Sequence, residues 1–162
     1  MIKAEIIGAD KVLANMAGIF PRVRAAAKQS ITRSLLELVA EVKSQKLSGQ
    51  VLRNRTGRLR RSIHMTGVTD SGNEISGVVG TNVEYAAAHE YGFTGTVTVK
   101  AHMRKITQAW GKSLKNPRQV SVSSHGRQVN LPEKSFLRSA LKEMAPGFIA
   151  RLQTDINEAL TK

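Results

Sequence analysis

The feature that most constrains the fold is a long run of regularly spaced apolar residues early in the chain. They recur at spacings of four, four, four, three and four, and they are Val23, Ala27, Ile31, Leu35, Leu38 and Val42. These spacings place the side chains on one face of an α-helix. We therefore expect a long helix that Pro21 opens and that ends at Leu47-Ser48-Gly49, preceded by a brief helix that Asp10 caps.

Alternating patterns predict β-structure in the middle of the chain. Residues 2–6 read as a short strand, and Ile63 and Met65 form a hairpin with residues 75–79 across a turn at 70–73. Residues 85–91 predict a short helical turn that Gly92 ends. After Pro132, a C-terminal helix would bury Phe136, Leu137, Ala140, Leu141 and Met144. Pro146 either kinks that helix or begins a new one.

The segment from Phe93 to Leu131 contains a mixture of patterns. Residues 96–99 alternate as in a strand, and residues 103–114 predict a helix with Ile106 and Trp110 on one side. Residues 120–122 and 129–131 flank a turn and predict a second hairpin. The whole layout is helical at both ends around a β-rich middle, and the 162 residues suit a single domain.

Composition excludes several classes of function. The chain has no cysteine, which excludes disulfides, thiol catalysis and thiolate metal sites. It has no apolar run long enough to cross a bilayer and no secretory signal pattern, so we expect a soluble protein made in the cytoplasm, with no membrane partner.

Motifs that would carry enzymatic chemistry are incomplete. His89-Glu90 begins a zinc-protease motif, but Phe93 stands where its second histidine belongs. Gly111-Lys112-Ser113 resembles the end of a phosphate-binding loop, but Ile106 replaces the opening glycine. No serine lies in a Gly-x-Ser-x-Gly elbow, and the carboxylates are dispersed. We expect no catalytic residue, no metal, no cofactor and no enzymatic activity.

Basic residues dominate the chain and gather in one segment. The formal net charge is +13, no acidic residue occurs between Glu41 and Asp70, and the segment 49–61 reads as an exposed loop. Five arginines of this loop are candidate partner-binding residues: Arg53, Arg55, Arg58, Arg60 and Arg61. Three interpretations stay open, which are sequence-independent binding of phosphates, docking on an acidic protein surface, and a solvated loop that aids solubility. The nearby chain has no aromatic residue to stack on a base.

Three ordered blocks resemble a known family. The first contains Thr56, Gly57, Leu59, Ser62 and Ile63, the second Tyr85, Glu90 and Gly92, and the third Pro132, Phe136 and Leu137. In this order they are similar to the tail-completion or neck proteins of tailed bacteriophages, a group also described as virion morphogenesis or minor tail protein Z-like. We expect these residues to determine the fold rather than to contact a partner, because glycine and proline shape turns and Phe136 anchors a helix.

The resemblance implies an α+β fold, in which a small antiparallel β-sheet is packed by a long N-terminal helix and a C-terminal helix. Lys134 replaces an arginine that is common in the third block. Residues 93–131 exceed the compact family core, and we interpret them as an inserted strand-helix-hairpin arm within one domain of residues 1–162.

The resemblance also implies a structural role at the head-tail junction. The partners would be further copies in a homo-oligomeric ring, the connector or head-completion protein, and the tail-tube or tail-terminator protein, with packaged DNA as a further candidate. The protein would be located in the virion neck or tail after assembly in the host cytoplasm. The alternative is a basic phage protein that binds nucleic acid.

Overall fold

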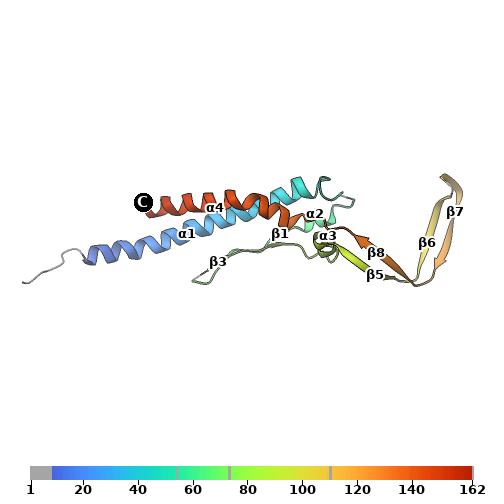
Figure 1. The fold of residues 1–162 in the computed structure, drawn as a ribbon, viewed down its shortest axis with the longest axis horizontal. Helices are drawn as coiled ribbons and strands as arrows, with labels where there is room; N and C mark the ends of the chain where they lie inside the picture. The colour runs from blue at the N-terminus through green and yellow to red at the C-terminus, as the bar shows by residue number, and fades with distance from the viewer. Residues whose placement is uncertain (1–8, 54, 73, 110, 162) are drawn as a thin grey trace, which may run out of the picture. The chain divides into compact units, whose positions relative to one another are not determined.

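The structure is a computed structural model that describes residues 9–53, 55–72, 74–109 and 111–161. The strand expected over residues 2–6 lies outside the described residues. The α+β class is confirmed by a long N-terminal helix, small antiparallel sheets and a C-terminal helix (Figure 1). The chain divides into two compact units, Met1–Ala86 with Lys134–Lys162, and Ala87–Glu133. A single domain with an inserted arm stays a prediction.

The first unit is built on α1 (Ala9–Glu41), which continues into one π-helical turn, η1 (Val42–Lys46). The prediction of two helices is wrong here, because Pro21 lies inside α1. A proline within a helix removes one backbone N–H and its hydrogen bond. The chain around Pro21 is exposed, and Arg22 Nε donates to the Gly18 carbonyl over 3.3 Å, so solvent and a side chain can satisfy carbonyl groups near the proline.

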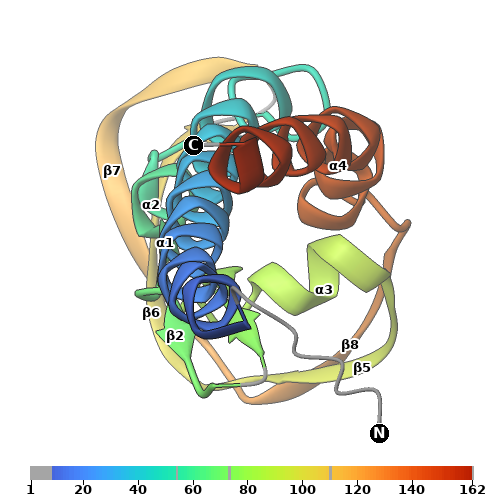
Figure 2. The same cartoon turned by 90° about the vertical axis from the view of Figure 1, so that its left-hand side faces the viewer.

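The C-terminal helix α4 (Leu137–Thr161) lies beside α1 (Figure 2). Arg151 Nη1 lies 2.6 Å from Glu37 Oε2, and Lys46 Nζ lies 2.7 Å from Glu143 Oε1. The order of these two ion pairs shows that the helices are antiparallel. Pro146 lies inside α4, which excludes the alternative of a new helix beginning there.

The core of the first unit joins both helices to the segments between them. Its buried apolar residues are Leu38, Val42, Leu47, Ile63, Val83, Ala86, Phe136 and Ala140. The apolar face predicted for the first helix is therefore fully buried only toward its C-terminal end. Leu141, expected in the core, is 48% exposed.

The predicted hairpin after Ile63 is confirmed as two short antiparallel ladders. They are formed by β1 (His64–Met65) with β4 (Val79–Gly80), and by β2 (Thr69–Asp70) with β3 (Ile75–Ser76). Asp70 connects this hairpin to α1, because Arg24 Nε lies 2.9 Å from each of its carboxylate oxygens.

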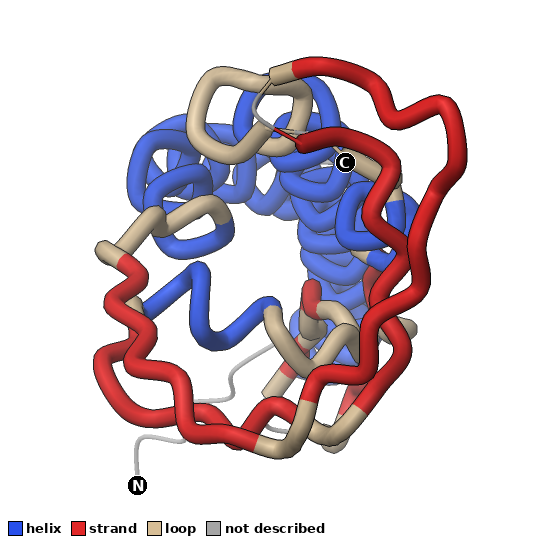
Figure 3. The backbone as a smooth tube through the Cα atoms, turned by 90° about the vertical axis from the view of Figure 1, so that its right-hand side faces the viewer, coloured by secondary structure: helices blue, strands red, loops and turns tan. Residues whose placement is uncertain are grey.

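The second unit contains most of α3 (Ala86–Tyr91) and four longer strands. As predicted, the short helix is followed by Gly92, whose φ is 76°. The strands pair antiparallel as β5 (Phe93–Val99) with β8 (His125–Leu131), and as β6 (His102–Ala109) with β7 (Lys112–Val122). They are the long red segments in Figure 3.

The two long ladders share one register. Val99 pairs with His125, and after two residues on each side His102 pairs with Val122. They therefore form one long hairpin, interrupted at residues 100–101 and 123–124. The register shifts beyond Ile106, where Pro117 lies, and this agrees with the confinement of proline to strand irregularities.

This pairing overturns two predictions. Residues 103–114 form strand, turn and strand rather than a helix, and residues 120–122 pair with 102–104 rather than with 129–131. The physical reason is that Ile106 and Trp110 alone give a helix too narrow an apolar face, whereas strand pairing supplies backbone hydrogen bonds along most of the segment.

Candidate functional site

The arginine-rich segment is partly ordered by local hydrogen bonds. The prediction of a loop over 49–61 is wrong at its end, because Arg58–Ser62 form the short helix α2. Gly57 precedes it with φ 71°, a left-handed conformation that glycine adopts without steric cost. Arg61 N donates to Gly57 O over 2.9 Å, and Arg58 N donates to Thr56 Oγ1 over 3.4 Å. These bonds define where α2, the helix that carries Arg58, Arg60 and Arg61, begins.

Apolar residues between the arginines hold the segment on the core. Val51, Leu52 and Leu59 are half-buried and pack against the core cluster, and Leu52 N donates to Lys46 O over 3.2 Å. All five arginines are exposed. The segment is therefore an anchored surface with outward-facing guanidinium groups. We call these five residues, Arg53, Arg55, Arg58, Arg60 and Arg61, the arginine surface.

A hollow of about 300 Å³ opens beside α2. It is lined by Lys43, Gly57, Arg60 and Arg61. Arg61 Nη2 donates to the Thr56 carbonyl over 3.2 Å, which orients that guanidinium. Among the residues that the structure describes, none of the five arginines forms an ion pair. Three cations around one hollow can bind carboxylate or phosphate oxygens through charge-assisted hydrogen bonds.

The other residues of the first block lie next to this surface. Ser62 Oγ donates to Leu59 O over 2.8 Å and shares a 2.6 Å hydrogen bond with Thr81 Oγ1. Ile63 is fully buried in the core. The block thus joins the arginine surface to Thr81, which follows β4, through a polar contact, and to the core through Ile63.

The second and third blocks each contain exposed and buried residues. Tyr85 is 41% exposed, whereas Glu90 is buried, with 5% exposed. Pro132 is exposed, Phe136 is buried, and Leu137 is half-buried against the core cluster.

Residues 8–92, which are 85 of 162, match the family described as "Bacteriophage HK97-gp10, putative tail-component". The chain belongs to this HK97-gp10-like family. The match includes the first two sequence blocks and the arginine surface, whereas the third block lies beyond it. No curated protein and no solved structure matches the chain.

Family membership confirms the resemblance to phage tail proteins and identifies this HK97-gp10-like chain as a structural phage tail component, which implies a location in the virion. Within the described part of the chain, no helix has the length and apolar character needed to span a membrane.

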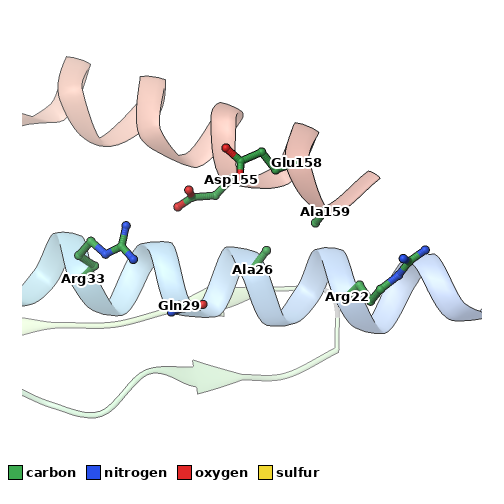
Figure 4. Close-up of a pocket in the computed structure, with 7 residues that line it drawn as sticks. All are labelled: Arg22, Ala26, Gln29, Arg33, Asp155, Glu158 and Ala159. Atoms are coloured by element: carbon green, nitrogen blue, oxygen red, sulfur yellow. The ribbon is translucent and has the colours of Figure 1, made fainter. Parts of the chain in front are cut away.

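A second hollow, of about 320 Å³, lies between α1 and α4 (Figure 4). Its lining residues are Arg22, Ala26, Gln29, Arg33, Asp155, Glu158 and Ala159. Two cations and two carboxylates balance in charge, so this hollow lacks the net field that would attract an ion. In the described ranges, no three His, Asp or Glu side chains gather closely enough to hold a metal ion.

Sequence reasoning missed two residues of the site. Lys43 joins Arg60 and Arg61 only because η1 packs against α2. Thr81 reaches Ser62 across 19 residues of sequence. The available signal was the acid-free stretch from 42 to 69, which already includes Lys43.

Proposed function

We propose that this chain is a non-enzymatic virion protein at the head-tail junction, where copies form a ring that completes the tail or connector and lets head and tail join. The match of residues 8–92 to a family of phage tail components carries this proposal. The third block lies beyond the matched residues and follows the first two in the order expected of tail-completion proteins, which adds support. Assembly would take place in the host cytoplasm before the ring is built into the particle.

A ring requires that one face of each subunit binds a different face of the next. An apolar groove on the first unit supports such a contact. Leu35 and Leu38 of α1 and Leu152 of α4 line it. Ile149 is 57% exposed and Leu141 is 48% exposed at the same groove. Exposed apolar surface of this kind is typical of contacts between proteins.

The arginine surface supports a second contact of different chemistry. Its exposed guanidinium groups and the hollow beside Lys43 suit an acidic face of the connector, the tail-tube protein or the tail terminator. We infer that Arg53, Arg55, Arg58, Arg60 and Arg61 bind such a face. The interpretation of these arginines as a solvated loop that only aids solubility is less suitable, because Val51, Leu52 and Leu59 anchor the segment to the core.

The test is to delete the gene in its phage and analyse the particles. We expect separate heads and tails that join when purified protein is added, and we expect the protein in purified wild-type virions by mass spectrometry. Infectious tailed virions from the deletion, together with absence of the protein from wild-type particles, would refute the proposal. That outcome would favour the alternative of a nucleic-acid-binding phage protein outside the virion.

The groove has its own matched test. Ile149→Glu places a charge in the groove, whereas Leu36→Glu changes an α1 side chain that is 54% exposed and does not line it. We expect Ile149→Glu to abolish ring assembly, measured by analytical ultracentrifugation and electron microscopy, and Leu36→Glu to preserve it. Equal behaviour of the two variants would remove the groove from the ring contact.

A further inference from the structure

The long hairpin over residues 93–131 lies in the longest acid-free stretch of the chain, which runs between Glu90 and Glu133. It contains seven basic residues, Lys100, Arg104, Lys105, Lys112, Lys115, Arg118 and Arg127, and no Asp or Glu. All seven are exposed, and none forms an ion pair with any residue that the structure describes. The hairpin thus contributes +7 of the net +13. Its own residues leave this charge without compensation, so its natural neighbour is a polyanion.

The outer ladder, β6 with β7, carries cations on both of its faces. In an antiparallel ladder, paired residues share a face and successive residues alternate between faces. Arg104 pairs with Val120 and Ile106 pairs with Arg118, so both arginines lie on one face. Lys105 pairs with Gln119 on the opposite face. A flat acidic protein surface would meet only one of these faces.

A ligand with negative charges on both sides of the β-ribbon can contact the cations of both faces at once. The major groove of duplex DNA does so, because it is about 12 Å wide, accepts a two-stranded β-ribbon and has phosphates along both edges. The eight residues of β6 extend about 26 Å at ~3.3 Å per residue, which is close to the length of eight base pairs.

The high exposure of side chains in the outer ladder also indicates that a partner covers it. Nearly every side chain described in β6 and β7 is exposed, including Met103 at 61% and Val120 at 44%. A two-stranded ribbon with so little core is marginally stable alone, so a partner that covers it would stabilise it. Neutral hydrogen-bonding residues, Thr107, Gln119 and Ser121, lie between the cations and can bind phosphate oxygens.

We propose that the hairpin over residues 93–131 binds the backbone of duplex DNA without sequence preference, with Arg104, Lys105 and Arg118 contacting phosphates on the two sides of a groove. This binding site is distinct from the arginine surface. It does not depend on the location of the protein in the particle, so it can be tested separately from the head-tail role.

The test measures the affinity of the full-length protein for a 20-base-pair duplex by fluorescence anisotropy between 50 and 200 mM salt. The first variant is Arg104→Gln/Lys105→Gln/Arg118→Gln. The matched control is Arg53→Gln/Arg55→Gln/Arg58→Gln, which removes the same three charges from the arginine surface. Circular dichroism establishes that both variants keep the fold, which is expected because all six side chains are exposed.

We expect the hairpin variant to bind at least tenfold more weakly at 100 mM salt. The slope of log affinity against log salt should become shallower by about 2.7, since each lost phosphate contact contributes about 0.9. The control should stay within about threefold of the wild type. A wild type that fails to bind at 50 mM salt, or two variants with equal losses, would overturn the proposal.

Two competitors separate duplex DNA from other polyanions. Duplex RNA should compete weakly, because its major groove is too narrow to accept a ribbon. Polyglutamate at equal charge should also compete weakly. Stronger competition by polyglutamate than by DNA would overturn the proposal and assign the hairpin to an acidic protein surface.

Discussion

Ile63 shows how one side chain of the first block supports the fold. It is fully buried where α2 ends and β1 begins, in the cluster that also contains Val42 and Phe136. Ile63→Ala should lower the free energy of unfolding by about 2–5 kcal/mol, because it removes buried methyl groups and leaves a cavity. Val78→Ala is the control: Val78 is 64% exposed, and its loss should change stability by less than about 0.5 kcal/mol. Urea denaturation measures both, and equal losses would contradict the assignment of Ile63 to the core.

Asp70 links the β2–β3 hairpin to α1 and gives a pH-dependent prediction. The Arg24 guanidinium lowers the pKa of the Asp70 carboxyl to about 2, and the Gly72 backbone N–H adds to this effect. A carboxylate whose pKa is lowered in the folded state stabilises the protein above its unfolded pKa of about 3.9. The stabilisation is lost as the pH falls from about 4 through 2.

Asp70→Asn should therefore be less stable than the wild type at pH 7, and the two should converge near pH 2. Thermal unfolding across this pH range measures the difference. Glu74→Gln, on the same turn, should keep the wild-type pH dependence. A constant difference between Asp70→Asn and the wild type at every pH would show that the Arg24 contact is not the cause.

At the level of secondary-structure elements, local patterns predicted some segments and long-range pairing decided others. The apolar spacing from Val23 to Val42 predicted a long helix, and α1 contains nearly all of it. The position of its start was wrong, because propensity treats Pro21 as a boundary, whereas an exposed proline can lie within a helix that packs further along.

The helix predicted over 103–114 failed for a different reason. Arg104, Lys105 and Gln108 favour helices individually, but pairing with residues 112–122 outweighs that preference. Gly111, with φ 75°, was the missed signal, since it permits the turn between β6 and β7. The arginine surface could be predicted from the density of arginines in the sequence. The hollow beside it could not, because it forms only where η1 packs against α2, and the sequence of neither segment alone predicts that contact.

The base of the long hairpin depends on Gly92. Its φ is 76°, and a Cβ there would lie 3.1 Å from both Leu131 O and Glu133 N. Gly111 has a similar φ of 75° but open space around it. Both alanine variants should therefore incur the left-handed penalty of about 1–2 kcal/mol, whereas only Gly92→Ala adds a backbone clash. Hydrogen exchange should show the β5–β8 ladder opening more readily in Gly92→Ala than in Gly111→Ala. The reverse order would contradict this account.

At the scale of the whole molecule, positive charge limits how copies can come together. The proposed ring would place several chains of net charge +13 side by side, and the long acid-free segments of each chain would add to the repulsion. Only 12 acidic residues oppose 25 basic ones in each chain, and Glu37, Asp70 and Glu143 already pair within the chain. In the proposed ring, the apolar groove between α1 and α4 is therefore expected to contribute most of the attraction between copies. An acidic partner or DNA would neutralise the remaining positive charge of the ring.

The relation of the long hairpin to the rest of the chain can be tested by removing it. The eight buried core residues in the described part of the chain all lie outside residues 93–131, and Phe93 pairs directly with Leu131. Replacing residues 94–130 by Asn-Gly should close the chain with a two-residue hairpin turn. The shortened protein should unfold cooperatively in urea with a free energy within about 1 kcal/mol of the full chain, because no core contact is lost.

The same shortened chain should carry a net charge of +6, since seven basic residues and no acidic ones are removed. It should keep the arginine surface and lose affinity for duplex DNA, which separates the two basic regions in one molecule. Loss of cooperative unfolding would instead show that the hairpin is required for the core to form, and residues 93–131 would then be an integral part of the domain rather than an insertion.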